Sequence, residues 1–138
     1  MRNESSWNHA YGTSHFRHAP LDQKKDSLRL VKVLPDLSTD GLVECSIHHA
    51  VKSTPYICLS YTWGSSGNER AILISRKLLM VRRNLEAFLY VARTQLGYCF
   101  LWIDAICINQ ANAAERDHQV QRMGNIFAKA KMLITWLG

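Results

Sequence analysis

An apolar run with one carboxylate inside it constrains this chain more than any other stretch. Residues Phe100 to Gln110 are almost all apolar, and Asp104 stands in the middle of them. A strand that is apolar on both faces must be covered on both faces, which is typical of parallel sheets flanked by helices. A buried carboxylate is costly unless it is paired or hydrogen-bonded. Asp104 is therefore either a satisfied structural group or part of a site.

The size and composition of the chain fit one globular domain. It has 138 residues, 47% of them hydrophobic and 20% charged, which excludes a disordered or fibrous protein. The formal net charge of +6 is compatible with a nucleic-acid or anionic-lipid partner but establishes neither. No uninterrupted apolar run reaches the roughly 20 residues of a membrane helix, and no signal peptide is evident. We therefore expect a cytoplasmic protein with no membrane partner.

The four cysteines stand apart in apolar, strand-like sequence, at positions Cys45, Cys58, Cys99 and Cys107. None forms a CxxC pair, so we expect reduced, buried thiols rather than a disulfide framework. Cys45 lies near His48 and His49, but no second pair of ligands stands at zinc spacing. No metal site is predicted.

Turn signals and hydrophobic periodicity divide the chain into elements. Residues 1–26 are polar without an apolar period, and we expect a flexible tail there. Residues 27–138 are expected to form one domain, with strands over 28–34, 42–48, 56–63, 71–74, 78–81, 100–110 and 132–137. Helices are predicted after Asn84 and after Asn112, each of which is expected to cap its helix. The buried stripe of the second helix is predicted at Val120, Met123, Phe127 and Ala130.

The order of these elements predicts the fold class. The first two strands are expected to form an antiparallel hairpin. From residue 56 onward, strands joined by helices must lie parallel with right-handed crossovers. The prediction is an α/β domain, a parallel sheet flanked by helices, with the N-terminal antiparallel hairpin in front of it.

A ligand site is expected at one edge of this sheet. Ligands of open parallel sheets bind beyond the carboxyl ends of the strands, and the second helix begins at the same edge with unpaired N–H groups. We expect a nucleotide-like ligand to contact residues at these ends, namely Tyr61, Trp63, Gly64, Asn109, Gln110 and Arg116.

Several of these residues have a structural interpretation beside the functional one. Asp104 either accepts buried hydrogen bonds or pairs with an arginine, or else it is catalytic. Glu115 is either part of a capping box with Asn112 or a general acid. Trp63 is either a packing residue or a stacking platform.

A run of basic residues marks the region before the first helix, at Arg70, Arg76, Lys77, Arg82 and Arg83. It would suit nucleic acid electrostatically. No aromatic platform and no DNA-reading helix accompany it, so a solvated hairpin is the favoured interpretation and nucleic acid is not expected as a partner.

The motifs at these positions resemble the fungal heterokaryon-incompatibility (HET) domain. The resemblance runs from about Leu28 to the last residue, and its most specific block is Trp102 to Gln110. The matching residues are Pro55-Tyr56, Leu59 to Gly64, Asn84-Leu85, Leu101 to Gln110, Glu115-Arg116, Gln119-Val120, Met123, Ile126 and Trp136-Leu137-Gly138.

The resemblance implies a protein of fungal self/non-self recognition and cell-death signalling that acts by contact with itself or with other HET proteins. HET domains are thought to be distant relatives of TIR domains, which share a flavodoxin-like α/β sheet and of which some cleave NAD. It thus implies an alternative, an NAD-cleaving enzyme with Asp104 or Glu115 as the acid and Trp63 against the nicotinamide.

The chain departs from the family pattern in its length and at one turn. HET proteins continue past the Trp136-Leu137-Gly138 motif, and the glutamate of NAD-cleaving TIR domains lies on a helix after the third strand. We therefore expect a domain truncated at the C-terminus, either a contact domain without finished chemistry and without a cofactor or a non-functional remnant. Ser75-Arg76-Lys77 replaces the commoner Asn-Gly turn, which is expected to loosen that hairpin.

Overall fold

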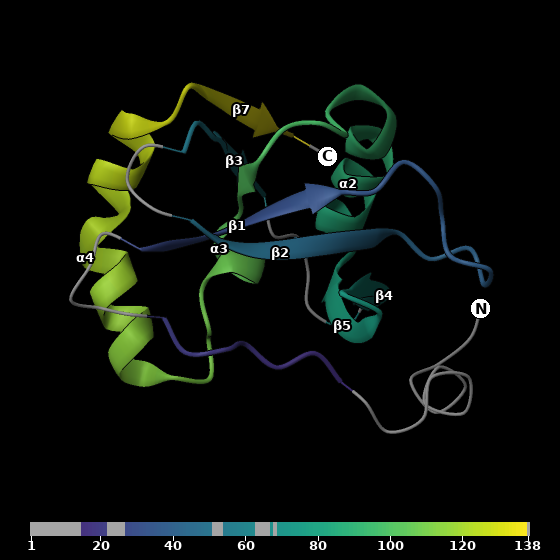
Figure 1. Ribbon diagram of the computed structural model, residues 1–138, viewed down its shortest axis with the longest axis horizontal. Helices are drawn as coiled ribbons and strands as arrows, with labels where there is room; N and C mark the ends of the chain where they lie inside the picture. Colours follow the sequence, from purple (N-terminus) through teal and green to yellow (C-terminus); the bar gives the residue numbers. More distant parts are fainter. Residues whose placement is uncertain (1–14, 22–26, 51–53, 63–66, 68, 138) are drawn as a thin grey trace.

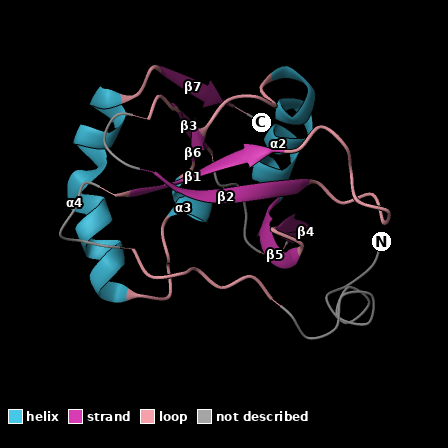
Figure 2. Cartoon of the chain, viewed as in Figure 1, coloured by secondary structure: helices cyan, strands magenta, loops and turns pink. Residues whose placement is uncertain are grey.

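The computed structural model describes residues 15–21, 27–50, 54–62, 67 and 69–137. Its elements, shown in Figure 1 and by type in Figure 2, are β1 (Leu28–Val33), β2 (Glu44–Ala50), β3 (Ile57–Tyr61), β4 (Glu69–Ile74), β5 (Lys77–Arg82), α2 (Arg83–Gln95), β6 (Leu101–Trp102), α3 (Asp104–Cys107), α4 (Ala113–Lys129) and β7 (Met132–Trp136).

The described strands form one mixed, seven-stranded sheet in the order β5-β4-β2-β1-β6-β3-β7. Strands β6, β3 and β7 lie side by side and parallel, as the sequence predicts. Strand β2 is parallel to β4, whereas β1 is antiparallel to both of its neighbours, β2 and β6. The α/β class is confirmed in this form, a sheet flanked by helices.

The N-terminal hairpin is confirmed, but its place differs from the prediction. Strands β1 and β2 pair from Leu28 opposite Ala50 to Val33 opposite Cys45. Instead of standing in front of the parallel strands, β1 occupies the middle of the sheet and pairs with β6 through Val31 and Leu101. A strand in that position is covered on both faces, and Leu30, Val31 and Val33 are fully buried.

The single long strand expected over Phe100 to Gln110 is wrong. Strand β6 covers only Leu101–Trp102, and the short helix α3 begins at Asp104. Ile103, Ile106 and Cys107 are buried, at a spacing that suits one helical turn. Short apolar runs do not distinguish a buried strand from a buried helix, and here tertiary packing decides. Asp104 therefore lies at a strand–helix junction, half-buried, rather than inside a strand.

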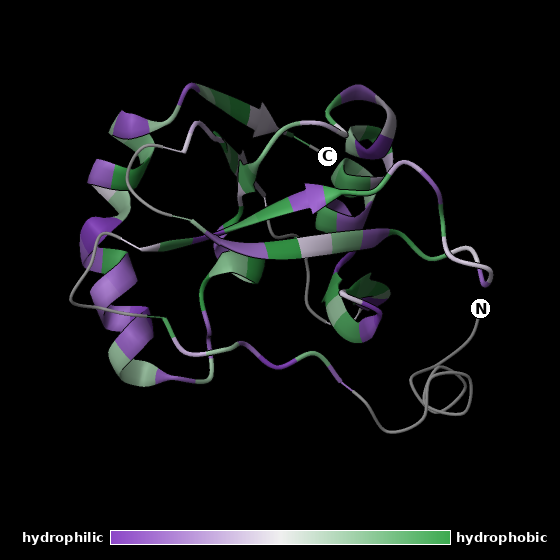
Figure 3. Cartoon of the chain, in the orientation of Figure 1, coloured by the Kyte–Doolittle hydropathy of each residue, from purple (hydrophilic) through white to green (hydrophobic). Residues whose placement is uncertain are grey.

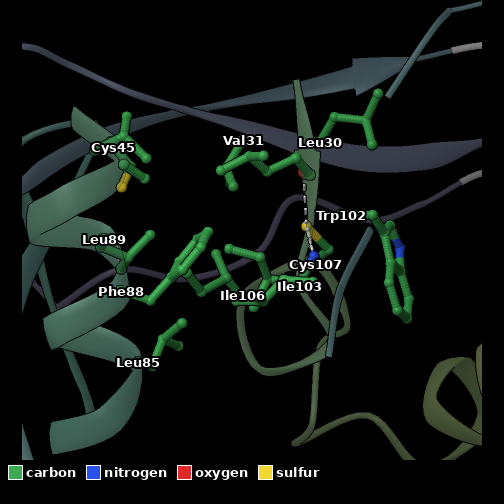
Figure 4. Packing of buried hydrophobic residues seen from close by; sticks show 14 of the residues in the cluster. Leu30, Val31, Cys45, Leu85, Phe88, Leu89, Trp102, Ile103, Ile106 and Cys107 are labelled. Carbon is green, nitrogen blue, oxygen red and sulfur yellow. Dashed lines mark hydrogen bonds between the residues drawn. The ribbon is translucent and has the colours of Figure 1, made fainter. Parts of the chain in front are cut away.

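Helices α2 and α4 cover opposite faces of the sheet, with α2 and α3 on one side (Figure 1). Leu85, Phe88 and Leu89 of α2 point toward Ile103 and Ile106, as Figure 4 shows. On the other face, Trp102 meets Phe127 of α4 edge-on, with ring centroids 5.8 Å apart.

The buried stripe of α4 differs from the prediction at Val120, which is 53% exposed. The residues of this helix that are buried are Glu115, Gln119 and Ile126, and Met123, Phe127 and Ala130 are partly buried against the core. Figure 3 shows mainly hydrophilic residues along the visible side of α4.

The two predicted caps have different outcomes. Asn112 caps α4, since its Oδ1 accepts the N–H of Glu115 at 3.0 Å. Asn84 does not cap α2, because that helix begins at Arg83 and its N-cap, Arg82, makes no side-chain cap bond. Asn84 instead donates through Nδ2 to the carbonyl of Thr62 at 2.9 Å, which joins the start of α2 to the end of β3.

The cysteines are free thiols, as expected. Cys45, Cys58 and Cys107 are buried, and Cys99 is partly exposed. Burial raises the pKa of Cys45 and of Cys107 to about 12, so these thiols act as small apolar core residues.

Candidate functional site

A buried ion pair joins β1 to α4. Arg29 Nη1 lies 2.6 Å from Glu115 Oε2, and Arg29 Nη2 lies 2.6 Å from Glu115 Oε1. The two side chains are 0% and 3% exposed. This two-pronged geometry is the strong form of an arginine–carboxylate pair.

Further hydrogen bonds make this pair a junction of four segments. Arg29 also donates to the carbonyl of Cys107 at 3.1 Å and to that of Ala19 at 2.7 Å. Glu115 Oε2 accepts the backbone N–H of Asn109 at 2.6 Å. The pair therefore fixes the loop between α3 and α4, and it ties residues 15–21 to the sheet.

The environment of Glu115 favours its ionised form. Burial alone would raise the pKa of the carboxyl, but the hydrogen bonds from Arg29 and Asn109 outweigh burial and hold the pKa below its ordinary value. A general acid needs the opposite shift. The geometry is that of a structural ion pair, and a catalytic role for Glu115 stays a prediction.

Tyr61 ends β3 and Asp104 follows β6, at the carboxyl ends of two neighbouring parallel strands. Burial raises the pKa of Asp104, against the hydrogen bonds of nearby backbone N–H groups. Burial also raises the pKa of Tyr61, and the negative charge of Asp104 adds to that shift. The charge of Asp104 therefore acts on Tyr61, at the edge where the sequence predicts a site.

Gln110 and Arg116 are linked to Asp104 by a chain of hydrogen bonds. Gln110 Nε2 donates to the backbone carbonyl of Asp104 at 3.1 Å, and Arg116 Nη1 donates to the carbonyl of Gln110 at 3.5 Å. Asn109 Oδ1 accepts the N–H of Ala111 at 3.2 Å, which shapes the turn before α4. These side chains are neighbours, and their role in binding stays a prediction. Trp63 and Gly64 lie outside the described residues.

An open pocket of about 550 Å³ lies beside this turn. Its lining includes Asn109 and Gln110 together with Phe16, Arg17 and His18. Tyr61, Asp104 and Arg116 are not part of its lining. The predicted site residues therefore form two neighbouring groups, one at the strand ends and one in the pocket.

The pocket depends on a segment that the sequence does not mark as structured. His18 Nε2 lies 2.6 Å from the carbonyl of Ile106, and Leu21 is 8% exposed. Residues 15–21 show no periodic pattern, so the sequence does not predict their contacts with Arg29 and Ile106.

Two further observations bear on the class of the site. Among the described residues, no three His, Cys, Asp or Glu side chains gather as metal ligands would. Within the same residues, every helix is too short or too polar to cross a membrane.

Comparison with known proteins relates the chain to one family. Residues 56–138 match the family described as heterokaryon incompatibility protein (HET). The chain is 35% identical over 136 residues to "Heterokaryon incompatibility protein 6, OR allele" of Neurospora crassa. That match covers 86% of this chain and 20% of the relative, so the chain spans about a fifth of the relative's length. No solved structure matches the chain.

Proposed function

Because this chain belongs to the heterokaryon incompatibility (HET) family, we propose that it acts in fungal self/non-self recognition by contact with other proteins in the cytoplasm. The observation that carries the proposal is the family match over residues 56–138, which includes the strands β3, β6 and β7 and the helices between them. The relative from Neurospora crassa, itself named a heterokaryon incompatibility protein, supports the same role.

The strand order supports a flavodoxin-like, and hence TIR-like, core. In chain order, β3, β6 and β7 are the first, second and third parallel strands, and in space they stand as second, first and third. The flavodoxin-like order begins in the same way, 2-1-3. The helices α2 and α4, which follow the first and second of these strands, cover opposite faces, as that topology requires.

Expression in living hyphae tests the contact function. Induced expression of the chain in Neurospora crassa should slow growth and increase uptake of a vital dye, and a tagged chain should recover a HET protein. Arg29→Met, which breaks the junction that orders the site, should abolish both effects. Asp117→Asn, on the exposed side of the same helix as Glu115, is the matched control and should retain them. Normal growth together with no recovered HET protein contradicts the proposal.

NAD cleavage is the second candidate, and one observation favours it. Asp104, a carboxyl with a raised pKa, follows β6 at the edge where the neighbouring parallel strand β3 ends at Tyr61, and nucleotides bind at such edges in open sheets. Incubation of the purified chain with NAD, followed by measurement of free nicotinamide, separates the two candidates. Activity that Asp104→Asn abolishes supports cleavage, whereas no nicotinamide release supports contact alone.

A further inference from the structure

The pocket beside the loop between α3 and α4 is separate from the strand-end residues. Leu79 and Met80, which line it, belong to β5, the outer strand at the opposite end of the sheet from β7. Tyr61 and Asp104, at the ends of β3 and β6, do not line it. Its volume of about 550 Å³ is in the range of pockets that hold small molecules. The pocket is therefore a second candidate site.

The N-terminal wall of this pocket is attached to β5. The wall consists of residues 15–21, which pass beside the loop between α3 and α4 (Figure 1). His15 forms a β-bridge with Leu78, and the N–H of Phe16 donates to the Leu78 carbonyl at 2.7 Å. Backbone pairing thus fixes the start of the wall at the edge of the sheet.

The other end of the wall is attached to α3 and β1. His18 Nε2 lies 2.6 Å from the Ile106 carbonyl, which can only accept, so Nε2 carries the proton and donates. Burial lowers the pKa of His18 from 6.5, so the ring is neutral at pH 7. Arg29 donates to the Ala19 carbonyl at 2.7 Å. Because both ends are held, the pocket is formed before any ligand arrives, which lowers the cost of binding.

The lining of the pocket is mostly apolar. An aromatic ring and a thioether are among its groups, and a thioether contacts aromatic rings favourably. Such a lining suits a ligand with a flat, apolar body. The apolar lining residues are Phe16, Leu79, Met80, Ala105, Ile108 and Ala111.

The polar groups of the pocket suit one negative charge. Arg17, which is exposed, is the one charged residue among the described residues of the lining, since His18 is neutral. Asn109 accepts the N–H of Ala111 through Oδ1, which leaves its Nδ2 hydrogens to donate. A guanidinium and an amide N–H are both donors, and a carboxylate accepts from both.

We propose that this pocket binds a small aromatic carboxylate. The ring lies against Phe16 and Met80. The carboxylate accepts hydrogen bonds from Arg17 and Asn109 at the mouth of the pocket. The proposal goes beyond the contact function, because it gives the chain a small-molecule ligand as well as protein partners.

Methyl NMR of the full chain tests the position of the site. The probes are 3-phenylpropanoate, its neutral amide 3-phenylpropanamide and the cation 3-phenylpropylammonium. With methionine methyl groups labelled, 3-phenylpropanoate should shift the Met80 signal with a dissociation constant of about 1 mM. The signals of Met123 and Met132, which do not line the pocket, should stay in place. Met80→Leu identifies the Met80 signal, and an unmoved Met80 signal at about 20 mM probe overturns the proposal.

The three probes and two arginine variants test the charge. The carboxylate should bind about fivefold more tightly than the amide, and the cation should bind most weakly. Arg17→Gln should reduce the affinity for the carboxylate to that for the amide. Arg83→Gln changes an exposed arginine outside the pocket by the same charge and should alter the affinity by less than about twofold. Equal losses in the two variants would mean that the net charge of +6 attracts the anion without a site, which overturns the proposal.

A pair of tryptophan variants tests the space in the pocket. Ala111 is exposed and lines the pocket, whereas Ala113 is exposed and does not. Ala111→Trp should block binding of 3-phenylpropanoate, and Ala113→Trp should leave it unchanged. Binding that survives Ala111→Trp overturns the site. A chain that slows hyphal growth but binds no probe also overturns this proposal and leaves the contact function intact.

Discussion

Arg29 in β1 and Glu115 in α4 lie 86 residues apart in sequence, and their two side chains meet in two contacts of 2.6 Å each. Both side chains are almost fully buried. A buried pair of this kind is a poor source of net stability but is costly to break, because the remaining charge loses its partner inside the protein.

Removal of one partner should therefore destabilise the fold strongly. Arg29→Met leaves the Glu115 carboxylate buried without its counter-ion and should lower the free energy of unfolding by about 3–5 kcal/mol, as measured by urea denaturation. Adding Glu115→Leu should restore part of the loss, since both charges are then gone. Asp117→Asn, which affects an exposed pair of 3.8 Å with Arg116, should change stability by less than about 0.5 kcal/mol. A loss below about 1 kcal/mol in Arg29→Met would contradict the burial of the pair.

Stability should fall as the pH drops below neutrality because of His18. Burial lowers the pKa of His18 from its ordinary value of 6.5, and the charge of Arg29 adds to this effect. The unfolded chain therefore binds a proton at a higher pH than the folded chain does, and the contribution of His18 is lost as the pH falls from 6.5 to the lower pKa of the folded chain. Burial lowers the pKa of His49 too, with the same sign.

Urea denaturation between about pH 7 and about pH 5 measures how the free energy of unfolding depends on pH. His18→Gln should reduce this dependence, and adding His49→Gln should reduce it further. Glu115 affects stability at a lower pH. Its pKa is lowered in the folded chain, so its contribution to stability is lost only as the pH falls below its ordinary pKa of 4.5. A dependence on pH that is unchanged in the double variant would show that the fold lowers the pKa of neither histidine.

The sequence predicts features that depend on local patterns, and it does not predict interactions between side chains that are far apart in the sequence. The hairpins, the parallel strands and the Asn112 cap depend on neighbours in sequence or on alternation, and they are confirmed. Arg29 looks like the polar side of a half-buried strand, and only the fold reveals the glutamate that neutralises it. The same limit applies to His18, whose partner carbonyl is 88 residues away.

The prediction of a single strand after Phe100 failed for a different reason. The composition of this apolar run is equally suitable for a strand and for a buried helical turn, and the structure uses both in succession. The candidate site shifts with it, because Asp104 begins a helix and Asn109 and Gln110 move into a loop. Neighbouring positions could thus be anticipated, whereas the division into strand-end residues and pocket residues could not.

The corrected buried face of α4 predicts a contrast between two of its residues. Ile126→Ala removes a side chain that is 2% exposed and should cost about 2–4 kcal/mol of unfolding free energy. Val120→Ala changes a side chain that is 53% exposed and should cost less than about 0.5 kcal/mol. Thermal and urea denaturation of the two variants would measure the two losses of unfolding free energy. Equal losses would show that Val120 is buried in the core.

The turn between β4 and β5 predicts a stabilising substitution. Ser75 and Arg76 have φ values of 50° and 67°, in the left-handed region that asparagine and glycine tolerate better than other residues. Arg76→Gly should therefore raise the free energy of unfolding by about 0.5–1 kcal/mol, and adding Ser75→Asn should raise it a little further, with an unchanged dependence on urea concentration. Gly41→Ala is the reverse control, since Gly41 has a φ of 80° and an added Cβ would meet nothing within 4 Å. That variant should lose about 1 kcal/mol from backbone strain alone. Destabilisation by Arg76→Gly would mean that the arginine side chain contributes more to this hairpin than its backbone conformation costs.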